Sequence, residues 1–177
     1  MIDEYLNETS EILKLIDRNK IQQIIEILNN LNGRLFILGV GGSAGNASHA
    51  VNDFRKIMGI EAYTPSDNIS ELTAITNDDG WENVFQHWLV GSRLNKNDCI
   101  LVFSVGGGNH KISYNIVKAL QYGKAIGCKI IGIVGRDGGY TNKVADVCLI
   151  IPTVNEKTIT PHTEEFQSII WHLIVNE

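Results

Sequence analysis

The chain has 177 residues, of which 44% are hydrophobic and 20% are charged, and its formal net charge is -5. This length and composition are typical of one globular domain with a sizeable core. The acidic balance and the lack of a basic cluster exclude nucleic acid and an anionic membrane surface as expected partners. No apolar run reaches the length of a membrane span, and the acidic start lacks an apolar signal core, so we expect a cytoplasmic protein.

The first thirty-three residues have a helical pattern. Apolar residues recur at helical spacing early in this segment and again at Ile21, Ile24, Ile25 and Leu28, before Asn32-Gly33 ends the pattern. We therefore expect residues 1–33 to form a helical extension and residues 34–177 to form an α/β core, together making a single domain. The extension is too apolar to lie free, so it must pack on the sheet or on a partner subunit.

The rest of the chain alternates between apolar strands and helices. Strands are expected at residues 34–38, 61–64, 99–103, 129–134 and 147–151, and helices at 43–57, 70–75, 82–89, 112–125 and 163–175. Continuous apolar strands separated by helices indicate a parallel sheet that is covered on both faces. The expected fold is therefore α/β, with a doubly wound, mostly parallel, five-stranded sheet of the flavodoxin-like kind.

The three cysteines, Cys99, Cys128 and Cys148, lie in or beside the expected strands. Because their number is odd and a cytoplasmic location is expected, we interpret them as reduced, buried thiols. No two of them have CxxC spacing, which argues against a thiolate metal site.

Two glycine-rich turns each follow an apolar strand. The first is GVGGSA at residues 39–44, and the second is SVGGGN at residues 104–109. Glycine lets backbone N–H groups approach an anion closely, and the start of the following helix adds a favourable dipole. Because both turns belong to the carboxyl edge of one sheet, they predict one phosphorylated ligand that is gripped from two sides.

Two other interpretations of these turns stay open. The first turn fits the relaxed dinucleotide fingerprint GxGxxA, and Glu61 falls where an acidic ribose ligand is expected. Against a dinucleotide site, the chain has no room for a separate substrate domain, Ser43 suits a phosphate monoester, and the second turn would have no role. The remaining alternative is that both turns are only tight connections between strand and helix.

Polar residues on two helices form a second candidate site. His49 and Asp53 are four residues apart and share a helix face, while Glu164 and His172 are eight apart on the last helix. A histidine and a carboxylate from each helix could act as an acid/base pair or bind a divalent metal such as zinc. The alternatives are solvated helix faces and, since its helix is apolar nearly all round, a buried structural role for His172.

Two further polar segments have local explanations. The run NDDG at residues 77–80 is a polar break between short helices, for which a capped turn is the simplest explanation. Arg136 follows another strand at the same sheet edge, where it either pairs with Asp137 or contacts a phosphate.

Taken together, these motifs resemble the SIS (sugar isomerase) domain and, within it, the phosphoheptose isomerases. The resemblance covers nearly the whole chain. It rests on the turn at residues 39–44, His49 six residues after Ser43, the segment LTAITND at 72–78, the loop that starts at Ser104, and GRDGG at 135–139. It implies a parallel sheet flanked by helices and a homotetramer with sites at the subunit interfaces.

The resemblance also implies an activity, namely conversion of sedoheptulose 7-phosphate to D-glycero-D-manno-heptose 7-phosphate through an enediol. Asp53 and His172 would be the acid/base pair, and zinc would bind His49, Asp53, Glu164 and His172. Substrate contacts are implied for Gly41, Gly42, Ser43, Asn77, Asp78, Ser104, Val105, Gly106, Gly107, Asn109 and Glu164. The alternatives are another SIS sugar-phosphate isomerase and a non-catalytic sugar-phosphate-binding module.

The chain departs from the family pattern at several of these positions. Val40 replaces the usual asparagine, and residues 105–108 lack the usual hydroxyls, so backbone amides would hold the phosphate with fewer hydroxyl contacts. Asp53 is one methylene shorter than the usual glutamate, and Glu164 replaces glutamine. Two carboxylates beside two histidines favour a zinc-bound enzyme.

Overall fold

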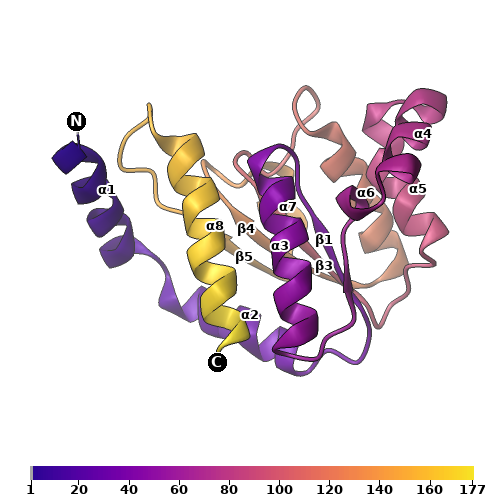
Figure 1. Ribbon diagram of the computed structural model, residues 1–177, viewed down its shortest axis with the longest axis horizontal. Helices are drawn as coiled ribbons and strands as arrows, with labels where there is room; N and C mark the ends of the chain where they lie inside the picture. The colour runs from indigo at the N-terminus through magenta and orange to yellow at the C-terminus, as the bar shows by residue number, and fades with distance from the viewer. Residues whose placement is uncertain (1) are drawn as a thin grey trace.

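The computed structural model describes residues 2–177, and it contains a five-stranded parallel sheet flanked by helices on both faces (Figure 1). The strand order is β2-β1-β3-β4-β5, which confirms the expected α/β fold. The strands are β1 (Leu35–Leu38), β2 (Ala62–Tyr63), β3 (Cys99–Ser104), β4 (Lys129–Val134) and β5 (Val147–Ile150). The order reverses between β1 and β3, and the carboxyl edge at such a reversal is where open parallel sheets bind ligands.

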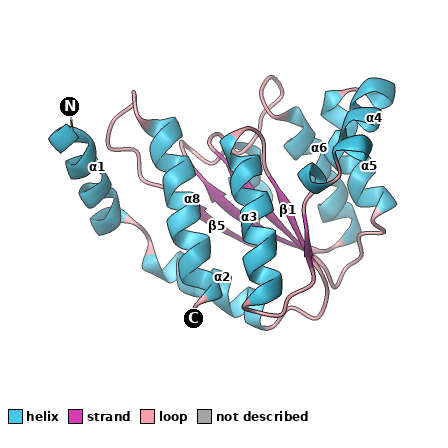
Figure 2. Ribbon diagram, viewed as in Figure 1, coloured by secondary structure: helices cyan, strands magenta, loops and turns pink. Residues whose placement is uncertain are grey.

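Two helical layers cover the sheet, as Figure 2 shows. One layer contains α1 (Ile2–Leu15), α2 (Arg18–Asn29), α3 (Gly42–Lys56) and α8 (Ile159–Val175). The other contains α5 (Val84–Gly91), α6 (Tyr114–Ile126) and α7 (Gly139–Val144), with α4 (Ile69–Asp79) packed at its border. Among residues 2–177, no helix combines the length and the apolar character needed to cross a bilayer.

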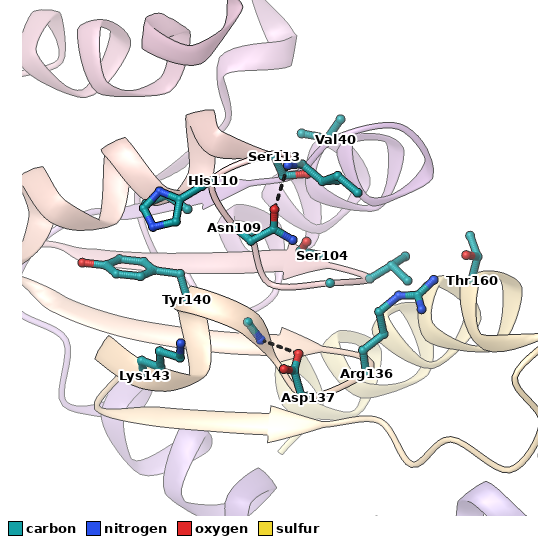
Figure 3. Close-up of a pocket in the computed structure, with 16 residues that line it drawn as sticks. Val40, Ser104, Asn109, His110, Ser113, Arg136, Asp137, Tyr140, Lys143 and Thr160 are labelled. Carbon is teal, nitrogen blue, oxygen red and sulfur yellow. Dashed lines mark hydrogen bonds between the residues drawn. The ribbon is translucent and has the colours of Figure 1, made fainter.

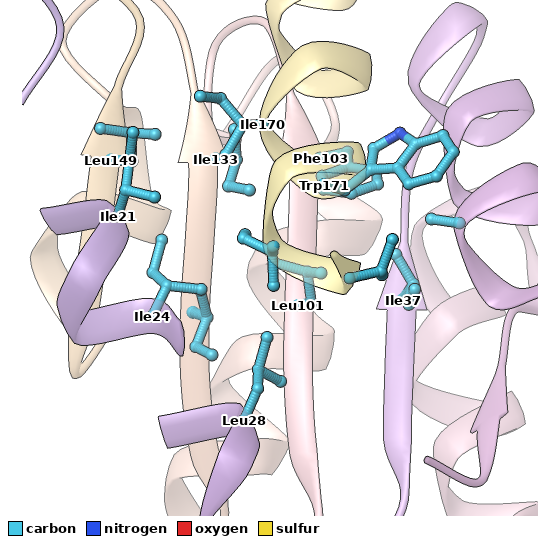
Figure 4. Packing of buried hydrophobic residues seen from close by; sticks show 14 of the residues in the cluster. Ile21, Ile24, Leu28, Ile37, Leu101, Phe103, Ile133, Leu149, Ile170 and Trp171 are labelled. Carbon is cyan, nitrogen blue, oxygen red and sulfur yellow. The ribbon is translucent and has the colours of Figure 1, made fainter. Parts of the chain in front are cut away.

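Alternate strand residues supply the two cores. In β3, Leu101 and Phe103 face the layer of α3 and α8, whereas Ile100 and Val102 face the layer of α5 and α6. All four side chains are fully buried, which explains why the strands are continuously apolar in sequence. Figure 4 shows Trp171 of α8 beside the first of these cores. The core thereby fixes α3 and α8 side by side on the sheet.

Two helices extend about one turn beyond their predicted bounds, a third was not predicted, and the others agree to within two residues. α8 begins at Ile159, four residues before the predicted start, because Pro161 fits the first helical turn, where its missing N–H costs nothing. α4 continues beyond the predicted end at residue 75 to Asp79, and Gly80 ends it with a φ of 85°. The six-residue helix α7 was not predicted, because its first N–H groups bond to carbonyls of the distant loop after β3.

A polar cluster attaches α1 to the start of α8. His162 Nε2 lies 2.8 Å from Glu8 Oε2, and the Tyr5 ring stacks on His162 with centroids 4.3 Å apart. Glu8 also accepts hydrogen bonds from Asn155 Nδ2 (2.5 Å) and Thr158 Oγ1 (2.8 Å). These partners, Asn155 first and His162 next, lower the pKa of Glu8. Ile12 is the one α1 residue in the buried core, so this cluster supplies much of the anchoring of α1.

We expect α1 to loosen in acid. Because the folded-state pKa of Glu8 lies below its ordinary value of 4.5, its stabilising effect is complete above that pH and is lost as the pH falls through the folded-state pKa. Amide hydrogen exchange in residues 2–15, corrected for intrinsic rate, should therefore accelerate below about pH 4.5. Glu8→Gln should accelerate it already at pH 7, whereas Glu4→Gln on the same helix should not. Wild-type protection of Glu8→Gln at pH 7 would contradict the anchoring role.

Candidate active site

A cavity of about 730 Å³ opens at the carboxyl edge of the sheet (Figure 3). Its walls come from the segments that follow β1, β3 and β4, together with the starts of α6 and α8. The lining residues are Val40, Ser104, Val105, Gly106, Gly108, Asn109, His110, Ile112, Ser113, Val117, Arg136, Asp137, Gly139, Tyr140, Lys143 and Thr160. The sheet thus places a concave polar site where doubly wound folds bind ligands.

Glycines bring the loop after β3 and the turn after β4 into direct backbone contact. Gly107 has a φ of 66° and Gly139 a φ of 50°, both in the region that favours glycine. A Cβ on Gly107 would overlap the Gly138 carbonyl, and one on Gly139 would overlap the carbonyl of Gly106. The Gly107 carbonyl accepts hydrogen bonds from both N–H and Oγ1 of Thr141 (2.9 and 2.7 Å). The two segments therefore form one rigid wall of the cavity.

The loop after β3 contains several residues predicted to bind substrate. Ser104, Val105, Gly106 and Asn109 line the cavity. Gly107 lies between them and donates its N–H to Ser104 Oγ (3.0 Å). Asn109 Oδ1 accepts from the N–H groups of residues 111 and 112 (2.8 and 2.9 Å). The polar side chains of this loop thus hold its own backbone in place.

The first glycine turn is arranged differently from the prediction. Gly41 and Gly42 are exposed, and Ser43 is fully buried and donates to Gln167 Oε1 (3.0 Å). The Glu164 carboxylate lies against the start of α3, where a Cβ on Gly42 would overlap it. A carboxylate is a favourable neighbour for a helix N-terminus. It takes the position where we had expected a ligand phosphate, so within this chain the cavity is not gripped by both turns.

Asn77 and Asp78 lie in the last turn of α4, outside the lining of the cavity. Both are exposed, and Asn77 Nδ2 donates to Asp78 Oδ1 (2.8 Å). Within one chain they bond to each other, so their predicted contact with substrate would require the surface of α4 to face a site on another copy.

His49, Asp53 and His172 meet on the outer surface of α3 and α8. Asp53 Oδ2 lies 3.8 Å from Nε2 of each histidine, and one possible ligand atom from each residue falls within 4.8 Å of the others. Their side chains are 59%, 14% and 44% exposed, respectively. Glu164 is not part of this group, because it lies two turns before His172 on α8, about 12 Å along the axis. We call His49, Asp53 and His172 the triad.

The surroundings of the triad fix its orientation. His172 Nδ1 lies 2.7 Å from the Ser168 carbonyl, which can only accept, so Nδ1 carries a proton and Nε2 is the nitrogen that holds the lone pair in the neutral ring. Trp171 stacks on His172 with centroids 3.4 Å apart and contacts His49 edge-on at 4.7 Å. The supporting role of Trp171 was not predicted, since its periodicity matches an ordinary core residue. A neutral imidazole with an unprotonated nitrogen beside a carboxylate can transfer protons or ligate a metal.

The three cysteine thiols are unreactive near neutral pH. Cys99, Cys128 and Cys148 are free, and the first two are buried. Burial raises the pKa of Cys128 to about 12 and that of Cys148 to about 11. All three stay protonated near neutral pH, so none is a nucleophile or a ready metal ligand.

The triad and the cavity are separate within one chain. Thr160 lines the cavity at the start of α8, and His172 lies twelve residues, about 18 Å, further along the same helix. None of the triad residues lines the cavity. One chain thus carries two separate polar sites on its surface, the cavity and the triad.

Comparisons with known proteins agree with this architecture. The SIS domain family matches residues 4–135. The chain is 32% identical to the phosphoheptose isomerase of Helicobacter pylori (strain P12), over 97% of this chain and 86% of that protein. It is 31% identical to the phosphoheptose isomerase of Aliarcobacter butzleri (strain RM4018), over 98% and 93%. Its structure superposes on the phosphoheptose isomerase of Neisseria gonorrhoeae with a TM-score of 0.85 and 25% identity, covering 99% of this chain and 92% of that one.

The chain therefore belongs to the SIS domain family of sugar isomerases. Within that family it is similar to the phosphoheptose isomerases along nearly its whole length. This confirms the family that the glycine turns and the helix motifs had indicated.

Proposed function

We propose that this chain is an isomerase that converts sedoheptulose 7-phosphate to D-glycero-D-manno-heptose 7-phosphate, and so supplies heptose for surface polysaccharides. The observation that carries the proposal is the similarity to phosphoheptose isomerases over 97% of the chain. Three free thiols fit a reducing compartment, and we place the enzyme in the cytoplasm.

The proposed chemistry moves a proton between C1 and C2 of the sugar through an enediol. We assign Asp53 as the base that takes the proton from carbon, because its Oδ2 is the carboxylate oxygen that faces both histidines. We assign His172 as the group that exchanges a proton with the sugar oxygens, because its Nε2 keeps a lone pair while Nδ1 is anchored to Ser168. His49 supports the carboxylate from the other side.

We propose that the complete active site forms between copies of the chain in a homotetramer. The cavity and the triad are too far apart on one chain for a single sugar phosphate to use both. The surface around the triad is also apolar, with Ile169 and Leu173 of α8 42% and 40% exposed and Ile57 after α3 50% exposed. Packing this surface against a second copy would bury these side chains and bring one copy's triad to its neighbour's cavity.

The triad also fits a zinc ion. Two imidazoles and a carboxylate are common zinc ligands, and a backbone carbonyl that holds Nδ1–H is the usual support for a zinc histidine. His49, Asp53 and His172 would hold the ion, while Glu164 stays outside the group in this chain. Bound zinc would polarise a sugar carbonyl as a Lewis acid. Because the lone pair of His172 Nε2 would then bind the ion, His172 would exchange protons with the sugar only in the metal-free enzyme.

We expect zinc to stabilise the protein through the triad. At about one hundred times its dissociation constant, zinc adds about 2.7 kcal/mol of stability, which raises the Tm by about 5–10 °C for a chain of this size. The measurement is the Tm of chelated and zinc-loaded protein. His49→Ala should remove the shift, whereas His87→Ala, which changes an exposed histidine paired with Asp79, should keep it. Equal Tm and equal activity of the two forms would reject zinc.

The activity is tested by incubating the purified protein with sedoheptulose 7-phosphate and following the reaction by NMR, with and without zinc. Formation of the aldose heptose phosphate supports both the reaction and the substrate. If a folded protein gives no conversion under either condition, the proposal fails for this substrate. The alternatives are then another sugar phosphate or a non-catalytic binding module.

A further inference from the structure

Two cations line the cavity from the segment that follows β4. Arg136 lies in the turn after β4, and Lys143 lies on α7. Figure 3 shows the Arg136 guanidinium directed toward the loop at residues 104–109. These two cations outnumber Asp137, the one carboxylate among the lining residues that the structure describes, so the cavity attracts an anion although the chain has a net charge of -5.

Neither cation is neutralised by a neighbouring acid. Among the ion pairs and side-chain hydrogen bonds of residues 2–177, none involves Arg136 or Lys143. No Arg136 nitrogen lies within 4.0 Å of the adjacent Asp137 carboxylate, whose Oδ1 accepts the N–H of Gly139 (3.1 Å). The sequence had left open whether Arg136 binds Asp137 or a phosphate, and the geometry removes the first choice.

The backbone holds Arg136 over the glycine loop. Its φ of 51° lies in the left-handed region, which a non-glycine residue adopts at a cost. A Cβ on Gly106 would lie 3.8 Å from Arg136 Cδ, so the stem of the arginine passes over a position that carries no side chain. The bonds from Thr141 to the Gly107 carbonyl keep the two segments together. The guanidinium is therefore presented to the loop by a rigid wall.

The loop itself offers few side-chain donors and no charge to a phosphate. Residues 105–108 carry no hydroxyl, so only the Ser104 hydroxyl and the Asn109 amide can donate from side chains, while Ser104 Oγ and Asn109 Oδ1 accept backbone N–H groups. We propose that Arg136, assisted by Lys143, binds the phosphate dianion in this cavity and determines specificity for phosphorylated ligands. An arginine fork suits this role because it donates two parallel hydrogen bonds to one phosphate. The identity of the ligand as a sugar phosphate rests on the proposed function.

The test measures binding of inorganic phosphate by calorimetry, separately from turnover. Arg136→Gln should weaken phosphate binding about tenfold or more and reduce its dependence on salt, since hydrogen bonds to a charged group are lost. Arg136→Lys, which keeps the charge and loses the fork, should fall between Arg136→Gln and wild type. Lys143→Gln should weaken binding less than Arg136→Gln, and it serves as the second variant if Arg136→Gln does not fold. Lys124→Gln, a control in the last turn of α6 away from the cavity, should bind like wild type.

A second arm uses sedoheptulose 7-phosphate, for which Arg136→Gln should raise KM while kcat changes little. Phosphate binding that depends on Arg136 without any turnover would uphold this inference and reject the proposed isomerase. Wild-type phosphate affinity and salt dependence in both Arg136→Gln and Lys143→Gln would overturn the inference, even if the protein isomerises the sugar. Failure of wild type to bind phosphate at millimolar concentration would overturn it as well.

Discussion

Asp53→Asn is expected to lower kcat for sedoheptulose 7-phosphate by a factor of about 10²–10⁴ and to leave the protein folded. The amide has nearly the same shape and can still accept the hydrogen bond that Asn52 Nδ2 donates to Asp53 Oδ1 (2.7 Å). What it lacks is the basicity needed to take a proton from carbon. Turnover is measured by NMR, and folding by circular dichroism and the Tm.

Solvent exchange separates a lost base from a lost binding site. In D₂O the wild-type enzyme should incorporate deuterium at the carbon that exchanges its proton, and Asp53→Asn should not, although its affinity for the sugar phosphate should stay near wild type. Asp3→Asn, which changes an exposed carboxylate on α1, is the matched control and should behave as wild type. Retained turnover in Asp53→Asn would reject Asp53 as the base and leave His172 as the remaining candidate of the pair.

The strands and the pairing of His49 with Asp53 could be predicted from local patterns. β4 was predicted at residues 129–134, where the structure has it, because a continuous apolar run ends at Gly135. His49 and Asp53 share a face of α3 because four residues make about one helical turn. Their approach to His172 was raised from the spacing only as one possibility and was implied by the family resemblance, since it depends on how α8 packs beside α3.

The position of Glu164 could not be predicted in this way. Its spacing from His172 was consistent with one shared site, but eight residues span about 12 Å of helix. The structure places its carboxylate at the start of α3, beside Gly42. Tertiary packing decides which neighbour a carboxylate on a helix contacts. Helical periodicity in the sequence carries no information about that packing.

The glycine turns illustrate a second limit. Their sequences indicated close approach of an anion to the backbone, whereas Gly107 and Gly139 are required because two backbone segments approach each other. Both situations demand a residue without a Cβ, so the sequence cannot distinguish them. Arg136 was noticed as a candidate from its place after a strand, but only the structure shows that no ion pair joins it to Asp137, whose carboxylate accepts the Gly139 N–H instead.

Mixing two inactive variants is expected to restore activity if the active site forms between copies. Asp53→Asn damages the triad and keeps the cavity. Gly106→Asp damages the cavity and keeps the triad, because position 106 has no positive φ and a Cβ there makes only ordinary contact with Arg136. Its carboxylate repels a phosphate. Each variant alone should be inactive, the first because it lacks the base and the second because its cavity does not bind the phosphate.

In randomly mixed oligomers at equal proportions, about a quarter of the sites should combine an intact triad from one copy with an intact cavity from its neighbour. Co-refolded or co-expressed mixtures should therefore recover about a quarter of wild-type kcat at unchanged KM. A mixture of Asp53→Asn with His172→Asn should recover nothing, because both changes lie in the same half. The mixture of Asp53→Asn with Gly106→Asp could also stay inactive although the oligomers exchange subunits. In that case the triad and the cavity of the same chain must act on one substrate molecule. Because Thr160 and His172 lie about 18 Å apart on the same helix, α8 would then have to unwind or break for one sugar phosphate to reach both places.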